Sequence, residues 1–263
     1  MSNYEQFETD GMVTLRRDGK GAPLVILPGA MADAYTWKAV ADALQVPNPV
    51  IIVNRRGRAP SRGLGENYDL QVEIDDLNTL VKSLAEPVHL FAWSYGALIA
   101  IQAVASGLMV RSLIAYEPVS CPFVPDATEP IRRAVAAGDT GLAVELINTL
   151  VSGFDASVVE ALRTGPDWQK LCRLAEPAGE EIAAINNVEP DYVSYSTIQV
   201  PLTLMVGELT EGCEPYGTAF SRFQRTMPNA RLARLRGQGH LAHVEAPELL
   251  AAEIGKILDS VFE

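Results

Sequence analysis

The chain is poor in histidine, cysteine and basic side chains. Its 263 residues contain 3 histidines and 3 cysteines, and 21 lysines and arginines stand against 33 aspartates and glutamates, which gives a formal net charge of −12. This acidic balance argues against nucleic acids and anionic membranes as partners, because both carry negative charge. We therefore expect a small-molecule substrate, no nucleic acid and no membrane as partners, and the sequence leaves a homodimer open.

The three cysteines, Cys121, Cys172 and Cys213, are odd in number and lack the spacing of a metal site. Free thiols of this kind fit a reducing compartment. The N-terminal segment has neither the basic region nor the apolar run of a secretory signal peptide, and no stretch of the sequence is long and apolar enough to cross a bilayer. We expect a cytoplasmic protein that uses neither a metal nor a cofactor.

Apolar residues are abundant, at 48%, and they fall into alternating strand-like and helix-like stretches. Such alternation predicts the α/β fold class, with a mostly parallel central sheet flanked by helices. The expected strands are 12–17, 24–28, 49–53, 87–92, 110–116, 201–206 and 231–235, and the expected helices lie near 35–45, 70–84, 95–106, 216–227 and 245–262.

The alternation stops between residues 120 and 195, where short helical stripes are separated by turn signals and no strand pattern is evident. We expect this segment to be a helical cap inserted into an α/β core formed by residues 1–119 and 196–263. A cap rich in small and aliphatic side chains favours an apolar or mixed substrate.

The most informative segment is 92–96, Ala-Trp-Ser-Tyr-Gly, which lies between an apolar strand and a helix. A serine with small residues two positions before and after it is the pattern of a nucleophile elbow. Because the backbone turns sharply there, larger side chains at Ala92 and Gly96 would clash. Ser94 would then stand at the apex with its hydroxyl exposed and strained backbone around it.

A histidine that can serve as the base follows the last expected strand. His240 lies on the glycine-rich loop that begins at Gly237, and glycines let such a loop bring the imidazole over the sheet edge. The order of the chain, with the nucleophile first and the histidine last, agrees with this role. His89 lies inside a strand and His243 in the following segment, and we expect structural roles for both.

With these stretches the chain resembles the α/β-hydrolase superfamily, in its capped serine-hydrolase form. The resemblance runs from about residue 12 to the C-terminus. Segment 54–61, Asn-Arg-Arg-Gly-Arg-Ala-Pro-Ser, is similar to the family's turn after the fourth strand, and 200–208 is similar to its seventh strand. The resemblance implies the α/β-hydrolase fold and a Ser94–His240 catalytic pair, but it says little about the substrate.

The resemblance also implies an oxyanion hole built from two backbone N–H groups. The family's first contributor follows His-Gly at the end of the third strand, which corresponds here to Ala30 after Pro28 and Gly29. Replacement of that histidine by Pro28 leaves the N–H of Ala30 available. The second contributor is the N–H of Tyr95, the residue after the nucleophile.

The acid that orients the histidine departs from the family pattern. After the seventh strand the family commonly carries aspartate, but this chain has Thr210, which cannot hold a negative charge. Glu117, at the end of an apolar strand, is the first candidate to accept the hydrogen bond from His240, because a buried acid is costly unless paired. Glu211 is the second candidate and Glu208 the third, and a serine–histidine pair without an acid is the fourth.

These residues predict a serine esterase of the triad type, in which Ser94 attacks a small or medium, largely apolar carboxylic ester, lactone or thioester and forms an acyl-enzyme. Two alternatives stay open. Because Thr210 replaces the usual acid, the chain could instead use its serine and histidine for non-hydrolytic chemistry, as a lyase, a cyclase or a cofactor-free oxygenase. A receptor-like ligand-binding protein of the same fold is the other alternative.

Overall fold

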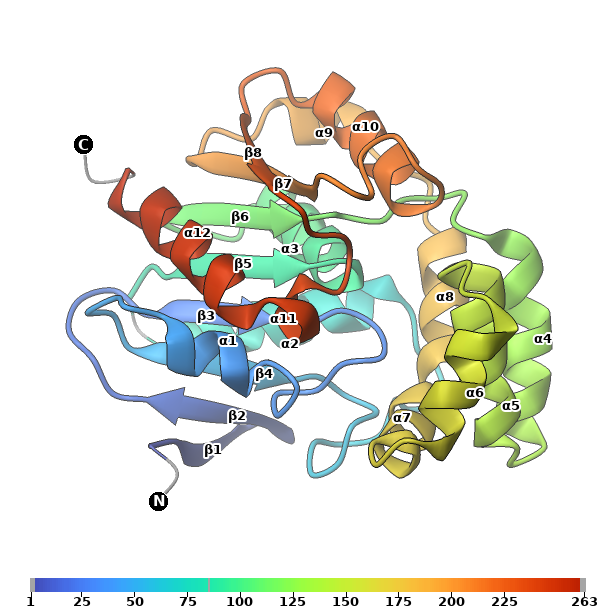
Figure 1. Cartoon of the computed structure of the whole chain (residues 1–263). Helices are drawn as coiled ribbons and strands as arrows, with labels where there is room; N and C mark the ends of the chain where they lie inside the picture. Colours follow the sequence, from blue (N-terminus) through green and yellow to red (C-terminus); the bar gives the residue numbers. More distant parts are fainter. Residues whose placement is uncertain (1–2, 85, 261–263) are drawn as a thin grey trace.

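A single sheet of eight strands organises the part of the chain that the computed structural model describes, residues 3–84 and 86–260 (Figure 1). The strands lie in the order β1-β2-β4-β3-β5-β6-β7-β8. β2 runs antiparallel to both β1 and β4, and every other neighbouring pair is parallel. The bounds are β1 (Glu5–Thr9), β2 (Met12–Arg17), β3 (Leu24–Leu27), β4 (Val50–Asn54), β5 (His89–Trp93), β6 (Ser112–Tyr116), β7 (Leu202–Gly207) and β8 (Arg231–Leu235).

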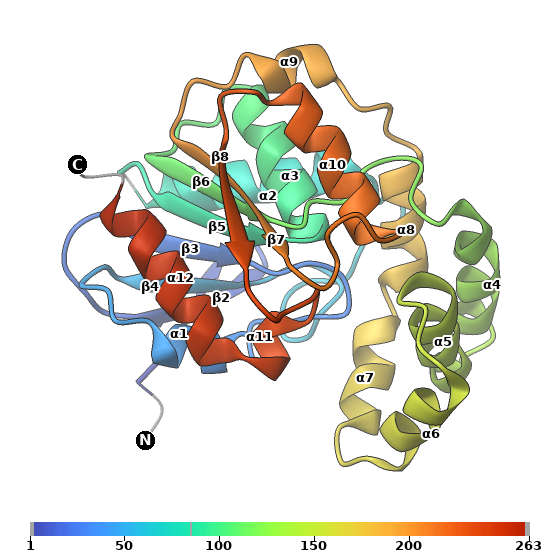
Figure 2. The same cartoon turned by 45° about the horizontal axis from the view of Figure 1, so that its top comes forward.

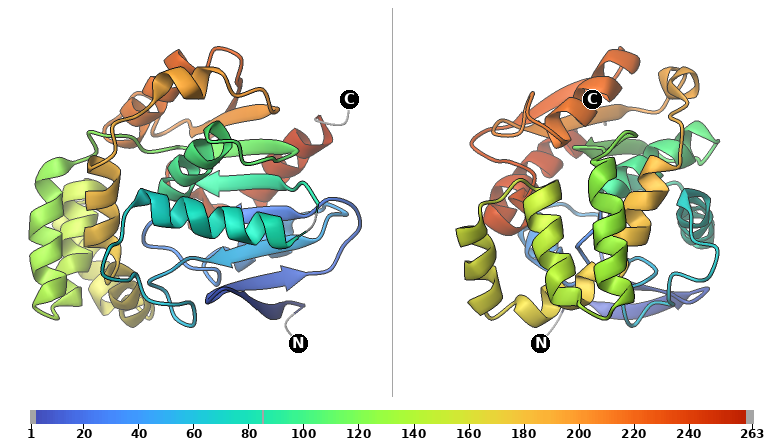
Figure 3. Two further views of the ribbon diagram at one scale, coloured as in Figure 1. Left: turned by 180° about the vertical axis from the view of Figure 1, so that it is seen from behind. Right: turned by 90° about the vertical axis from the view of Figure 1, so that its right-hand side faces the viewer.

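Helices cover both faces of the sheet. α1 packs against α12 on one face, with α11 leading into α12, whereas α2 and α3 lie on the other face, which the left view of Figure 3 shows from behind. α9 and α10 lie beside each other above β7 and α3 (Figure 2). Their bounds are α1 (Lys38–Ala43), α2 (Leu70–Ser83), α3 (Tyr95–Ala105), α9 (Tyr192–Ser196), α10 (Tyr216–Thr226), α11 (Ala242–Glu245) and α12 (Pro247–Asp259).

Residues 120–195, which we call the cap segment, lie between β6 and β7 and contain only helices and loops in the structure. Apart from α9, whose first residues end the segment, these helices gather at the carboxyl ends of the parallel strands (Figure 1). Their bounds are α4 (Pro125–Ala136), α5 (Thr140–Leu146), the π-helix η1 (Ile147–Val151), α6 (Ala156–Thr164), α7 (Trp168–Ala175) and α8 (Ala178–Asn186). Within the described ranges, the helices all lack the combination of length and apolar character that crossing a bilayer requires.

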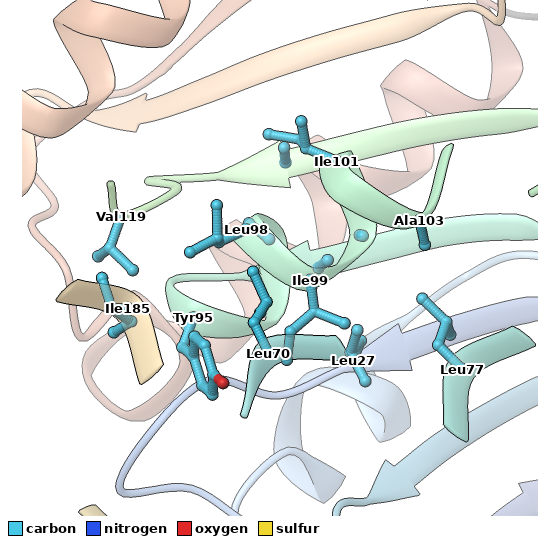
Figure 4. Packing of buried hydrophobic residues seen from close by; sticks show 14 of the residues in the cluster. Leu27, Leu70, Leu77, Tyr95, Leu98, Ile99, Ile101, Ala103, Val119 and Ile185 are labelled. Atoms are coloured by element: carbon cyan, nitrogen blue, oxygen red, sulfur yellow. The ribbon is translucent and has the colours of Figure 1, made fainter. Parts of the chain in front are cut away.

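The central helix α3 lies in the larger of two hydrophobic clusters. Every residue of α3 except Gln102 and Ala105 is buried, as expected for a helix that is apolar around its whole circumference. Figure 4 shows Ile99 of α3 in this cluster with Leu27 of β3 and Leu70 of α2. The residue before α3 is Ser94, so the candidate nucleophile precedes a helix that is buried along almost its whole length.

The α/β fold class and the seven expected strands are confirmed, each strand to within two residues at either end. β1 was not expected, because Glu5–Thr9 is largely exposed and polar and pairs only with β2 at the sheet edge. The helix expected near 245–262 corresponds to α12, although the backbone leaves helical geometry at Ala246, before Pro247, so residue 245 belongs to the short helix α11; residues 261–262 lie outside the described residues. The division into a core and a cap domain stays a prediction.

Candidate active site

Ser94 occupies the turn between β5 and α3 with φ 56° and ψ −120°, a conformation that non-glycine residues rarely adopt. Two glycines make this turn possible. A Cβ at Gly96 would lie 2.5 Å from the carbonyl oxygen of Leu27, and a Cβ at Gly29 would lie 2.8 Å from the Cβ of Ser94. The structure therefore has the crowded elbow that the sequence predicts, with Ser94 at its apex, but the expected exposure of Ser94 is wrong, because the residue is buried.

His240 is held over Ser94 by the ends of the two neighbouring strands. The indole Nε1–H of Trp93 donates to the carbonyl oxygen of His240 at 2.9 Å, and the hydroxyl of Tyr116 donates to the carbonyl oxygen of Gly239. These bonds fix the loop so that Nε2 of His240 lies 3.1 Å from Oγ of Ser94. The predicted pairing of Ser94 with His240 is thus present in the structure.

Glu117 provides the carboxylate on the other side of the imidazole. Its Oε2 lies 2.5 Å from Nδ1 of His240, and its Oε1 accepts hydrogen bonds from the backbone N–H of Gly207 at 2.8 Å and from the hydroxyl of Thr210. The side chain is fully buried, so these three donors replace the water that the carboxylate loses. The expected hydrogen bond between Glu117 and His240 is confirmed, whereas its role in catalysis stays a prediction.

The partners of His240 decide which ring nitrogen carries the proton. An ionised carboxylate can only accept hydrogen bonds, so Nδ1–H donates to Glu117. Nε2 then presents its lone pair to the hydroxyl of Ser94, which donates. This is the tautomer that a general base needs in order to take a proton from the serine.

The two alternative acids lie elsewhere. Glu211 forms an ion pair with Arg234 at 2.7 Å near the surface, and Glu208 accepts the backbone N–H of Gly237 at 2.8 Å. Thr210, at the position where the family commonly carries its acid, donates its hydroxyl to Glu117. The structure therefore removes Glu211 and Glu208 as partners of His240 and gives Thr210 a supporting contact.

Two aromatic rings enclose the imidazole, and one of them carries no recognisable signal in the sequence. Tyr216 of α10 stacks on His240 with ring centroids 3.5 Å apart and planes inclined by 12°, and Trp93 packs against the same ring at 4.8 Å. Burial raises the pKa of Tyr216 to about 12, so its phenol stays protonated. Tyr216 lies 24 positions before His240, and only the fold brings the two rings together.

The other histidines have structural surroundings, as expected. His89 lies on β5 with Nδ1 2.8 Å from Oγ of Ser112 on β6. His243 is only 4% exposed and stacks on Trp37 with ring centroids 4.7 Å apart. Burial, aided by the proximity of His240, lowers the pKa of His243 to about 3, so this imidazole is neutral at physiological pH.

The expected oxyanion groups lie on two segments that meet at Ser94. Tyr95 is the first residue of α3, where backbone N–H groups have no partner within the helix. Ala30 follows Gly29, whose Cα lies close against Ser94. Behind these segments lies a buried cluster of charged side chains that includes Arg55, which sequence reasoning did not identify as part of the site.

Comparison with known proteins adds to this geometry. N-formylmaleamate deformylase from Pseudomonas putida is 27% identical over 258 residues, which cover 93% of this chain and 91% of that protein. Two solved structures share the fold. An alpha/beta hydrolase from Sphaerobacter thermophilus has a TM-score of 0.82 at 24% identity, covering 97% of this chain and all of that one. The enol-lactonase from Burkholderia xenovorans has a TM-score of 0.74 at 15% identity, with the same coverage.

The model of the alpha/beta hydrolase family matches residues 24–253, which include the elbow, the cap segment and the histidine loop. Together these matches indicate a hydrolase. By the extent of this match, the chain belongs to the alpha/beta hydrolase family.

Proposed function

We propose that the protein is a serine hydrolase that cleaves a small or medium, largely apolar carboxylic ester, lactone or thioester through an acyl-enzyme on Ser94. The observation that carries this proposal is the continuous chain of hydrogen bonds from Glu117 through His240 to Ser94. Each group in that chain has the partner and the tautomer that proton transfer from a serine requires.

In the proposed reaction, Oγ of Ser94 attacks the carbonyl carbon while Nε2 of His240 takes the hydroxyl proton. The negative charge that develops on the carbonyl oxygen is stabilised by the N–H groups of Ala30 and Tyr95. His240 then gives its proton to the leaving group, which departs as the acyl-enzyme forms. A water molecule, activated by the same imidazole, releases the carboxylic acid and restores Ser94. Glu117 stabilises the imidazolium in both halves of the reaction.

The surroundings of the site support a small substrate. Ser94 and His240 are only 6% and 8% exposed, so the reacting atoms are nearly closed off from solvent. The helices of the cap segment gather at the same end of the sheet, and we infer that they shape the acyl pocket and exclude water. The deformylase relative acts, by its name, on an N-formyl amide, so short formamides are the second class of substrate to consider.

Glu117 also bears on the alternative functions. Lyases, cyclases and cofactor-free oxygenases became candidates because Thr210 leaves the usual acid position without charge. Since a carboxylate from the neighbouring strand, Glu117, contacts His240 instead, the reason for preferring these alternatives is weaker. A receptor-like binding protein does not need a serine that can act as a nucleophile. The hydrogen-bonded chain therefore favours hydrolysis over both alternatives.

Labelling with a fluorophosphonate tests the proposal directly. We expect intact-protein mass spectrometry to show one adduct per wild-type chain, peptide mapping to locate it on Ser94, and Ser94→Ala to give no adduct. A panel of short and long esters, lactones, thioesters and formamides then identifies the acyl and leaving groups. Wild-type protein that is folded but neither reacts with the probe nor cleaves any member of the panel would refute the serine-hydrolase mechanism.

A further inference from the structure

Four charged side chains form a buried cluster between the sheet and the cap segment. Nη1 of Arg55 lies 2.5 Å from Glu73 of α2, and Nη2 lies 2.5 Å from Glu181 of α8. Arg58 reaches the same Glu181 at 2.8 Å. All four side chains are between 0% and 3% exposed, so two arginines and two acidic side chains lie together away from the surface.

Stability alone does not explain this cluster. Charges taken out of water lose several kcal/mol of hydration each, and replacing a buried ion pair by apolar residues of similar volume is often neutral or stabilising. Here burial on its own lowers the pKa of Arg55 and raises that of Glu181, but their attraction reverses both shifts, so the pKa of Arg55 lies above its usual range and that of Glu181 below. Arg55 and Glu181 therefore stay ionised, whereas burial raises the pKa of Glu73 above its usual value.

The remaining donors of Arg55 bind the segment that carries one half of the expected oxyanion hole. Nε–H donates to the carbonyl oxygen of Pro28 at 2.8 Å, and Nη2–H donates to that of Gly29 at 2.9 Å. The carbonyl of Gly29 and the N–H of Ala30 belong to one planar trans peptide and point in opposite directions. A guanidinium on the carbonyl therefore fixes the direction of the Ala30 N–H and, by polarising the peptide, makes it a stronger donor.

Arg55 also contacts the residue that carries the other half. Its guanidinium lies over the ring of Tyr95, 5.0 Å from the centroid, and Figure 4 shows this ring within the core cluster. The hydroxyl of Tyr95 lies 3.1 Å from that of Tyr68, which donates to Glu73 at 2.8 Å. One guanidinium thus touches both segments whose N–H groups are expected to face the substrate oxygen.

We propose that Arg55 is a positioning residue, which fixes and polarises the peptide between Gly29 and Ala30, and that Glu181 of the cap segment holds Arg55 in place. This inference rests on the proposed function, because it takes the Ala30 N–H to be an oxyanion donor. Its consequence is that α8 and the oxyanion hole are coupled. The hole is complete only while the cap segment is docked against the core.

The test compares Arg55→Lys with a matched control in the same turn. Lysine keeps the charge but cannot bind two carbonyls and two carboxylates at once. Arg56→Lys removes a bidentate ion pair, 2.7 and 2.8 Å from the two oxygens of Asp76. In the structure Arg56 does not bind the carbonyls of Pro28 or Gly29. This control therefore separates the effect of losing a buried ion pair from the effect of losing the hydrogen bonds that hold the peptide between Gly29 and Ala30.

Two readouts are measured for each variant: steady-state kinetics with para-nitrophenyl acetate, and the backbone amide resonance of Ala30. For Arg55→Lys we expect kcat to fall by about tenfold to a hundredfold with little change in KM, since an oxyanion donor acts on the transition state. The amide nitrogen of Ala30 should move upfield as its peptide loses the hydrogen bond. Arg56→Lys should change neither.

A second variant, Glu181→Gln, covers the case in which Arg55→Lys does not fold. We expect a smaller fall in kcat, with KM again unchanged, and a smaller shift of Ala30 in the same direction. The inference is overturned if Ala30 does not move in either variant, or if Arg55→Lys behaves like Arg56→Lys. A wild-type chain that cleaves no ester would contradict the proposed function instead, and the Ala30 resonance would still decide whether Arg55 holds the peptide.

Discussion

His240 and His243 lie three residues apart and both pack against Trp93, at 4.8 and 4.3 Å between ring centroids, yet their surroundings are opposite in kind. Both nitrogens of His240 have partners that define its proton, one in Glu117 and one in Ser94. His243 lies among aromatic rings, and within the described residues its Nδ1 has no hydrogen-bond partner. A histidine becomes a base through its partners, whereas burial alone keeps it neutral and inert.

The largest expected effect is the difference in kcat/KM between a variant at His240 and a variant at His243. We expect His240→Ala to lower kcat/KM by about a thousandfold or more, as loss of a triad base does. His243→Phe keeps an aromatic ring in the stack and should leave kcat/KM near the wild-type value. Steady-state kinetics on the best ester of the panel checks both. A His240→Ala variant that keeps more than a tenth of the wild-type value would remove His240 from the chemistry.

The next effect concerns the carboxylate that distinguishes His240 from His243. Glu117→Gln preserves the size of the side chain but removes its charge, so the tautomer is no longer fixed and the imidazolium is not compensated. We expect kcat to fall by about a hundredfold or more, with unchanged circular dichroism. Glu211→Gln, on the exposed pair with Arg234, serves as the control and should be nearly silent. The reverse pattern would transfer the role to Glu211.

The surroundings of His243 predict a pH effect on stability. Its folded pKa of about 3 lies below the unfolded value of 6.5, so the unfolded chain binds a proton first as pH falls. The part of the unfolding free energy that depends on His243 being neutral is therefore fully present above pH 6.5. It is lost below that pH, by about 2 kcal/mol between pH 7 and pH 5. His243→Phe should remove this part of the pH dependence in urea unfolding. An unchanged slope between pH 7 and pH 5 would show that His243 does not titrate on unfolding.

The smallest effect tests the ring that covers His240 but not His243. Tyr216→Leu removes the flat face that holds the imidazole and stabilises it when charged, and we expect kcat/KM to fall by about tenfold. Tyr216→Phe keeps the face and loses only the hydroxyl, which lies 3.5 Å from Oγ of Ser152, so its kinetics should stay near those of the wild-type. Equal losses in the two variants would assign the effect to the hydroxyl instead.

Much of the fold could be predicted because its signals are local. The buried parallel strands are short apolar runs, and the interruption of their alternation marked residues 120–195 as helical. β1 carried no such signal, since an exposed edge strand such as Glu5–Thr9 needs no apolar pattern. The π-helix Ile147–Val151 likewise depends on how the cap segment packs, which no local pattern encodes.

The residues of the candidate site also fall into those that local sequence signals predict and those that only the fold brings together. Ser94, His240 and the two oxyanion positions follow from short motifs, and Glu117 was found because an acid ending a buried strand needs a partner. Arg55 and Glu181 were missed because their pairing joins positions 126 residues apart. The only available signal was that an arginine directly follows the buried strand β4, and nothing in the sequence indicated which carboxylates would meet it.

The contact between Thr210 and Glu117 has a consequence for how such chains diverge. β6 and β7 are adjacent and parallel, so the residues that follow them share one end of the sheet, and the hydroxyl of Thr210 reaches the carboxylate of Glu117. A lineage can therefore pass through ancestors with acids at both positions, where one carboxylate takes up a proton and the other stays ionised. Either acid can then be lost by mutation, and no generation along that path lacks a carboxylate beside the histidine.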